Sequence, residues 1–128
     1  MKKTIFALLL MALIAAPVWA ADYPLTFTWD DSNTKASGYG WKLFMRTDSG
    51  KYVYTAPVAT IQHVQGQTEF KADKTITLNG QPGSQVNCYF VLRAFSGALE
   101  SIDSNETTFQ AMIPLAAPFS FTVTVKTQ

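Results

Sequence analysis

Short stretches in which apolar and polar residues alternate recur along this chain. A period of two over about four to eight residues is typical of strands that bury one face. The stretches with this pattern are Leu25–Trp29, Trp41–Arg46, Lys74–Leu78 and Phe119–Val125. After residue 20, apolar residues do not recur at helical spacing over any long stretch. The pattern therefore predicts an all-β protein.

Other segments complete the predicted strands. Cys88–Phe95 is the most apolar stretch after residue 20, which favours a central strand, and Glu106–Met112 predicts a further strand. The turn residues Thr47–Gly50, followed by Tyr52–Tyr54, predict a hairpin, whereas Pro57–Lys71 predicts only a short strand and a loop. Strands of this length between turns are typical of an all-β sandwich or barrel, and no linker or repeat divides the chain, so we expect one domain.

Residues 1–20 have the pattern of a secretory signal peptide. Lys2 and Lys3 precede the apolar run Ile5–Ala16, and a small-residue cleavage site follows at Val18–Ala20. The apolar run is too short for a membrane-spanning helix, and no other apolar run in the chain is longer. We therefore expect an exported protein with no membrane span, located at the cell surface, outside the cell or in the periplasm. Cleavage would leave 108 of the 128 residues.

The charge of the chain is nearly balanced, with 10 lysine and arginine residues against 9 aspartate and glutamate residues. Proteins that bind nucleic acid by electrostatic attraction carry a clear basic excess. The balance therefore excludes a nucleic-acid partner of that kind.

Residues suited to catalysis or metal binding are sparse. Cys88 is the only cysteine and His63 the only histidine, which excludes an internal disulfide and leaves a zinc site without enough ligands. Within its apolar strand, Cys88 is expected to be an inert buried thiol. The acids Asp30 and Asp31, and the pair Asp103 and Glu106, are expected to be solvated turn residues rather than calcium ligands. No nucleophile elbow or phosphate loop occurs, so we expect no enzyme activity, cofactor or metal.

Several segments resemble the fibronectin type III family, in the form common in secreted bacterial proteins. Leu25–Asp30 is similar to strand B of that family, with Trp29 at the position of the core tryptophan. Gly40–Gly50 resembles strand C and its turn. Tyr89–Ala94 and the following Leu99–Glu106 are similar to strand F, its loop and the start of strand G. The resemblance implies an immunoglobulin-like, fibronectin type III-like sandwich of about seven strands over residues 21–113, incomplete at its N-terminal edge.

The resemblance also implies that one strand is missing at the front of the domain. Leu25 already belongs to the segment similar to strand B, so residues 21–24 leave no room for strand A. After the segment similar to strand G, however, the tail of residues 114–128 contains Pro114–Pro118 and then the alternating Phe119–Val125. This order resembles the proline-rich start and strand A of such a domain, placed at the wrong end of the chain.

Three fates are open for this spare strand. It can complete its own sandwich by a reversed insertion or a hairpin, it can be donated to a neighbouring copy, or it can stay disordered. Donation would make a head-to-tail filament or fibre, because a contact that does not close on itself continues indefinitely. In that case Phe119, Phe121, Val123 and Val125 would fill the open edge of the next sandwich. The leading hypothesis is thus a non-enzymatic, exported structural protein whose partners are other copies of itself.

The alternative is a monomeric secreted binding or adhesion module that recognises a glycan or a cell-surface partner. Exposed aromatic rings are the usual feature of sugar-binding surfaces. By strand alternation, Phe44 and Tyr89 should point away from the core residues Leu43 and Phe90. These two rings are the candidates for surface binding. The competing interpretation is that they form cross-strand pairs that stabilise the sheet.

Overall fold

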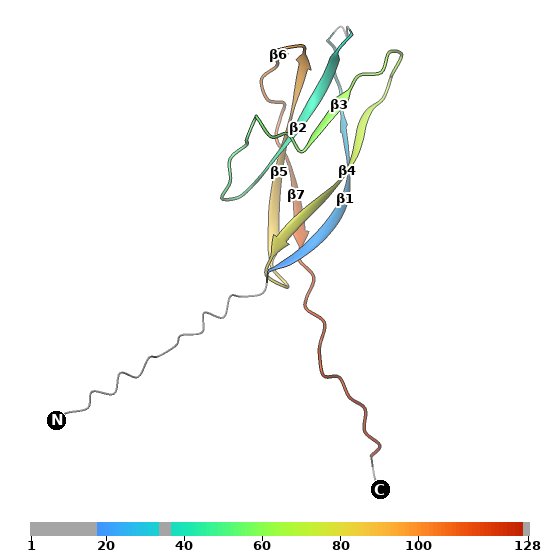
Figure 1. The fold of residues 1–128 in the computed structure, drawn as a ribbon, viewed down its shortest axis with the longest axis vertical. Coiled ribbons are helices and arrows are strands. Elements are labelled where there is room, and N and C mark those ends of the chain that lie inside the picture. Colours follow the sequence, from blue (N-terminus) through green and yellow to red (C-terminus); the bar gives the residue numbers. More distant parts are fainter. Residues whose placement is uncertain (1–17, 34–36, 127–128) are drawn as a thin grey trace, which may run out of the picture.

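The computed structural model describes residues 18–33 and 37–126. It is an all-β sandwich of two packed sheets (Figure 1). The seven described strands are β1 (Trp19–Trp29), β2 (Tyr39–Thr47), β3 (Ala59–Gln62), β4 (Phe70–Gly80), β5 (Gln85–Ser96), β6 (Leu99–Glu100) and β7 (Thr107–Met112). In the described part of the chain, no helix is long and apolar enough to cross a membrane.

The two sheets differ in width. One contains only β1 and β4, which run antiparallel from Trp19 opposite Gly80 to Trp29 opposite Phe70. The other has the order β3, β2, β5, with β6 and β7 both paired to the far side of β5. β5 is therefore central, as the apolar run Cys88–Phe95 predicts, because both of its edges are covered by other strands.

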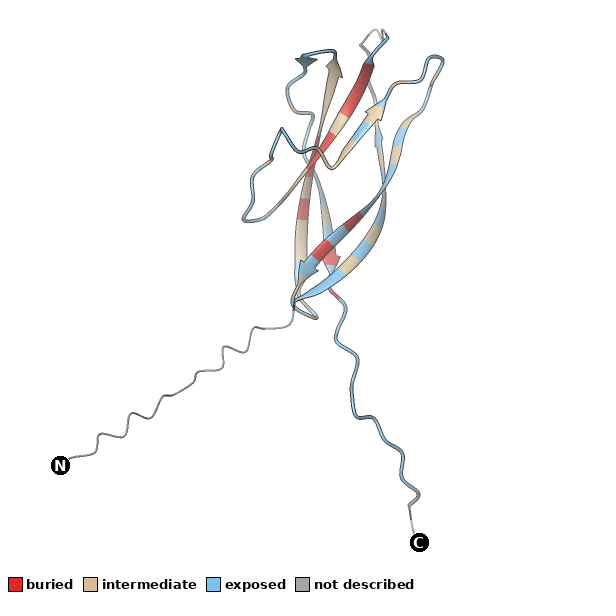
Figure 2. Ribbon diagram, in the orientation of Figure 1, coloured by how far each residue is buried: buried red, intermediate tan, exposed pale blue. Residues whose placement is uncertain are grey.

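The core lies between the sheets in the half of the sandwich where β7 ends. Inward side chains of β2, β4, β5 and β7 form it, with Ile113 just after β7. Its buried residues are Leu43, Ile76, Leu78, Cys88, Phe90, Ala111 and Ile113. The inward side chains of β1 are only half-buried, although they alternate with exposed residues along the whole strand (Figure 2). The β1 side of the sandwich is thus incompletely covered.

Three sequence predictions differ from the structure. The strand predicted from Leu25 begins at Trp19, within the predicted signal peptide, because inward and exposed residues alternate from Ala21 on and the pairing with β4 continues to Trp19 opposite Gly80. Tyr52–Tyr54 forms no strand, and β2 pairs instead with β3. The tail forms no strand in the described single copy and extends away from the sandwich (Figure 1). Residues 1–17 of the predicted signal peptide lie outside the described residues.

Candidate strand-docking groove

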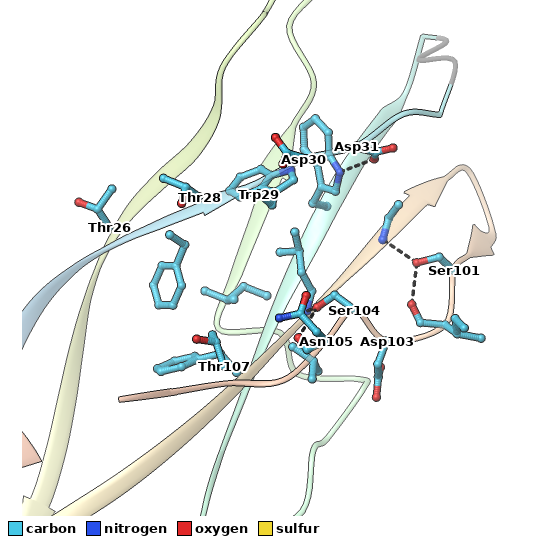
Figure 3. Close-up of a pocket in the computed structure, with 18 of the residues that line it drawn as sticks. Thr26, Thr28, Trp29, Asp30, Asp31, Ser101, Asp103, Ser104, Asn105 and Thr107 are labelled. Atoms are coloured by element: carbon cyan, nitrogen blue, oxygen red, sulfur yellow. Dashed lines mark hydrogen bonds between the residues drawn. The ribbon is translucent and has the colours of Figure 1, made fainter. Parts of the chain in front are cut away.

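A groove of about 820 Å³ opens between β1 and the chain that connects β6 to β7. One wall is Leu25–Asn33, from β1 and the residues after it, and the other is formed by residues 101–109. The floor contains Trp41 and Leu43 of β2 and residues Phe90 to Leu92 of β5. Figure 3 shows the labelled side chains of the two walls on either side of this space. We call it the docking groove.

The first wall is an unprotected sheet edge. β1 pairs with β4 on one side, and no described strand pairs with its other side. Free N–H and C=O groups along such an edge readily accept another strand. Because a two-stranded sheet is marginal on its own, a third strand on β1 would stabilise it and cover the half-buried Leu25 and Phe27.

The second wall departs from regular pairing with β5. Ser101 and Ser104 each donate their backbone N–H to a carbonyl of β5, at Ala94 and Leu92, over 2.8 and 2.9 Å. Their hydroxyl oxygens accept the N–H groups of the same two residues, each over 2.9 Å. Ser101 and Ser104 are three residues apart, whereas their partners Ala94 and Leu92 on β5 are two residues apart. The second wall therefore contains one extra residue, as in a β-bulge. The bulge leaves Ile102 exposed at the rim of the groove.

Ion pairs on the outer face of the sheet fix this second wall. Arg93 donates to Asp103 over 2.7 Å, and the hydroxyl of Tyr54 donates to the same carboxylate over 2.6 Å. Partial burial raises the pKa of Asp103, but the two hydrogen bonds and the charge of Arg93 outweigh burial and leave the pKa below its usual value. Likewise, Arg46 and Tyr52 both donate to Glu106. These acids are therefore paired, which corrects the expectation of solvated turn residues.

At one end, the lining of the groove extends past β1 to Asn33, and hydrogen bonds to Asp31 organise this end. Asp31 accepts hydrogen bonds from Trp41 Nε1 and from the hydroxyl of Tyr39, both over 2.8 Å. His63 packs edge-on against the rings of Tyr39 and Trp41, so this histidine is part of the aromatic packing at this end of the groove. In the described residues, no three histidine, cysteine or acidic side chains gather closely enough to hold a metal ion.

The other end of the groove is closed. The hydroxyl of Tyr23 on β1 donates to the carbonyl of Met112 on β7 over 2.5 Å. The ring of Tyr23 also meets Phe109 edge-on, with 5.6 Å between centroids. The lining of the groove begins just beyond this contact, at Leu25.

Trp29 contributes an unsatisfied polar atom beside the groove. Its Nε1 is buried and has no hydrogen-bond partner in the described part of the chain. Its ring lies edge-on to Trp41, with 5.2 Å between centroids. Leaving a buried N–H unpaired costs about 1–3 kcal/mol. An occupant of the groove that offers an oxygen would remove this cost.

The four tail residues predicted to mediate assembly are fully available. Phe119, Phe121, Val123 and Val125 are 83–91% exposed. The last buried residue before them is Ile113, whose backbone exchanges hydrogen bonds with Gly83 and Ser84 over 2.8 Å each. In this single copy the tail therefore does not complete its own sandwich.

The residues predicted to bind at the surface are less accessible. Phe44 does lie on the outer face, but it is only 1% exposed because the loop after β2 folds over it, with Tyr54 edge-on at 5.1 Å. Its prediction as a surface residue is wrong. Tyr89 is half-buried beneath Arg46, whose guanidinium carbon lies 4.1 Å from the ring centroid.

Cys88 is buried, as predicted, and forms no disulfide. Burial raises the pKa of its thiol, and the nearby negative charge of Asp48 raises it further. Both effects keep the sulfur protonated and unreactive at neutral pH.

Most of the groove could not be predicted from the sequence. The bulge at Ser101–Ser104 and the closure by Tyr23 depend on contacts between distant segments. The continued alternation upstream of Leu25 was the one local signal of a longer edge.

No protein family, curated protein or solved structure matches the chain.

Proposed function

We propose that this protein is an exported, non-enzymatic structural subunit that assembles head to tail. Each copy donates residues 119–125 to the docking groove of the next copy. The observation that carries the proposal is the match between an open groove along the β1 edge and an unpaired, alternating tail that leaves the opposite end of the same molecule (Figure 1). The resemblance to fibronectin type III domains, with one strand displaced to the C-terminus, supports the same proposal.

Distances favour donation over self-insertion. The tail leaves after Met112, which lies opposite Gln85 on β5, whereas Ser101 toward the Asp31 end of the groove lies beside Ala94. Nine residue steps of strand separate these points, which is about 30 Å. Residues 113–118 reach at most about 20–22 Å when fully extended. The tail of one copy thus does not reach the Asp31 end of its own groove, although it can reach that end of a neighbour. A reversed insertion into its own groove, parallel to β1, would have to displace the contact between Tyr23 and Met112.

The energy of such a contact is substantial. Burying a large apolar side chain contributes about 1.5–3 kcal/mol. Four such side chains, together with main-chain hydrogen bonds to β1, can offset the cost of ordering seven residues at about 1–2 kcal/mol of backbone entropy per residue. Strand addition of this kind combines main-chain affinity with side-chain specificity.

Deleting residues 114–128 tests the proposal. We expect the full-length protein to form particles of graded length in sedimentation velocity and bead-like filaments by negative-stain microscopy. The truncated protein should remain a folded monomer. A synthetic peptide of residues 114–128, added in trans, should then bind the truncated protein and change the fluorescence of Trp29 and Trp41, which both line the groove.

Two outcomes would contradict the proposal. If the truncated protein assembles as well as the full-length protein, another surface drives assembly. If the full-length protein stays monomeric and truncation unfolds it, the tail completes its own sandwich. The binding-module alternative has lost its main support, because Phe44 is buried and Tyr89 is half-covered by Arg46.

A further inference from the structure

The geometry of the groove constrains how a donated tail would lie in it. This inference rests on the proposed function and concerns the direction and register of the donor strand. The lining of the groove extends past the end of β1 to Asn33, whereas the contact between Tyr23 and Met112 closes the other end. A tail that arrives from a neighbour therefore enters where β1 ends. It then runs toward the start of β1, which makes it antiparallel to β1.

Pro24 identifies the residues of β1 that can pair with the donor. It lies opposite Thr75 within the unbroken ladder to β4, yet it has no N–H to contribute. A proline is tolerated in a strand where its nitrogen faces the free edge. Since the direction of the main-chain groups alternates along a strand, Thr26 and Thr28 face the free edge as well. Their N–H and C=O groups are thus available to the donor.

A side-chain contact supports this assignment. Thr26 donates to Asp73, its direct partner on β4, over 2.6 Å. Thr77 donates in the same way to Asp22, over 2.6 Å. Side chains approach most closely in the antiparallel pairs that share no main-chain hydrogen bonds. The even-numbered residues of β1 therefore direct their main-chain groups away from β4.

The face of each residue then restricts the register. Residues directly opposite each other in a sheet have side chains on the same face. Thr26 and Thr28 are exposed, so their partners must be the polar residues of the tail, Ser120, Thr122 and Thr124. This condition places Thr124 opposite Pro24, Thr26 or Thr28 and excludes the registers in between.

The ends of the groove select among these three registers. Pairing Thr124 with Pro24 loses a main-chain hydrogen bond and pushes Val125 against Tyr23, which already contacts Phe109. Pairing Thr124 with Thr28 leaves Leu25 uncovered. We propose that the donor lies antiparallel to β1 of the next copy with Thr124 opposite Thr26 and Thr122 opposite Thr28. Phe121 then lies opposite Trp29.

This register accounts for the extent of the groove. Residues 119–125 lie opposite residues 25–31, and the lining of the groove on the β1 side runs from Leu25 to Asn33. The four apolar tail residues face the floor residue Leu92 and the second-wall residue Phe109, which are both only partly buried. Trp29, whose Nε1 has no partner in the described residues, comes to lie beside the donor main chain.

Disulfide cross-linking between full-length variants tests the arrangement. Residues 28 and 122 lie opposite each other at the centre of the groove whether the donor strand runs antiparallel or parallel to β1. Cross-linking of T28C with T122C therefore shows that the tail docks, but not in which direction. The pair T26C and T124C should cross-link only if the donor is antiparallel. The pair T26C and S120C should cross-link only if it is parallel. Each cysteine is placed on a separate protein, and heterodimers are quantified on non-reducing gels after mild oxidation.

We expect the T26C–T124C heterodimer to exceed the T26C–S120C heterodimer by about tenfold or more, because cysteines with Cα atoms beyond about 7 Å do not bridge. Wild-type protein is the control for Cys88, which is buried. If any variant assembles less than wild type, serine at the same position shows whether the threonine itself matters.

The outcomes separate this inference from the proposed function. Cross-linking of T28C–T122C together with T26C–S120C would keep donation and overturn the antiparallel direction. Assembly without T28C–T122C cross-linking would overturn docking in this groove. A wild-type protein that does not assemble at any concentration would overturn the proposed function, and this inference with it.

Discussion

At the scale of single residues, neighbouring acids play very different roles. Asp31 accepts hydrogen bonds from Trp41 and Tyr39, whereas Asp30 is exposed. Asp31→Ala should lower the free energy of unfolding by about 1–3 kcal/mol, because it leaves the indole N–H of the buried Trp41 without an acceptor. Asp30→Ala is the matched control and should change stability by less than about 0.5 kcal/mol. Urea unfolding of the tail-deleted monomer measures the stability of both variants. Equal effects would show that the hydrogen bonds to Asp31 are not stabilising.

Asp103 predicts a dependence of stability on pH. Although partial burial raises its pKa, the hydrogen bonds from Tyr54 and Arg93 lower it below the usual value. The folded state therefore favours the carboxylate more than the unfolded state does. This contribution to stability is present above about pH 4, the ordinary aspartate pKa, and is lost as the pH falls through the lowered pKa of the folded state.

The change Asp103→Asn should remove this contribution. Between about pH 5 and pH 2 the variant should lose less stability than wild type, because it has no proton to take up at this site. Urea unfolding at a series of pH values measures the slope. Glu69→Gln, which removes an exposed carboxylate, is the control and should leave the slope close to that of wild type. A slope unchanged by Asp103→Asn would contradict the assignment.

At the scale of elements, the alternation of the tail makes a sharp prediction. Phe121 and Val123 should face the acceptor, whereas Ser120 and Thr122 should face solvent. The double variant Phe121→Asp/Val123→Asp should abolish assembly, because it would bury two charges without partners. The matched double variant Ser120→Asp/Thr122→Asp adds the same charge to the outer face and should assemble. All four residues are exposed in a single copy, so neither variant should alter the unfolding of the monomer.

Sedimentation velocity at matched concentrations distinguishes the two variants. Equal loss of assembly in both would mean that the tail acts through its net charge rather than as a strand. Unimpaired assembly of the Phe121→Asp/Val123→Asp variant would mean that the tail is not the donor.

Local sequence patterns predicted the positions of the strands better than they predicted which side chains are buried. The central position of β5 follows from its continuous apolar run, and the inner face of β2 follows from residue alternation. Tyr52–Tyr54 has the composition of a strand but folds over the sheet instead, because Arg46 and Arg93 hold both tyrosine rings against its outer face. The same contacts bury Phe44. Alternation predicts the face of a residue, but only tertiary contacts decide whether that face meets water.

The groove illustrates the same distinction. The alternating segment at the tail was visible in the sequence, and the resemblance to fibronectin type III domains predicted that a strand is missing at the front. The closure by Tyr23, the bulge at Ser101–Ser104 and the unsatisfied Nε1 of Trp29 were not, because each depends on residues far apart in the chain.

At the scale of the whole molecule, head-to-tail assembly has a polarity that can be tested with two complementary terminators. The first is the protein without residues 114–128, which can accept a strand but cannot donate one. The second is the variant Thr28→Pro, which lacks a main-chain N–H that we place on the free edge of β1. This variant can donate its tail strand but cannot accept one. Pro24 on the same edge shows that β1 tolerates proline in this orientation. Thr26→Pro is the substitute if Thr28→Pro unfolds.

Each terminator alone should be monomeric, and their mixture should form dimers and nothing larger. A head-to-tail contact uses two different surfaces, one on each partner, so one intact surface of each kind supports a single junction. Mass photometry or light scattering counts the copies, and wild type under the same conditions should give a series of lengths. Dimers of the tail-deleted protein alone, or oligomers beyond the dimer in the mixture, would show that the subunits meet through a surface other than the tail and the docking groove.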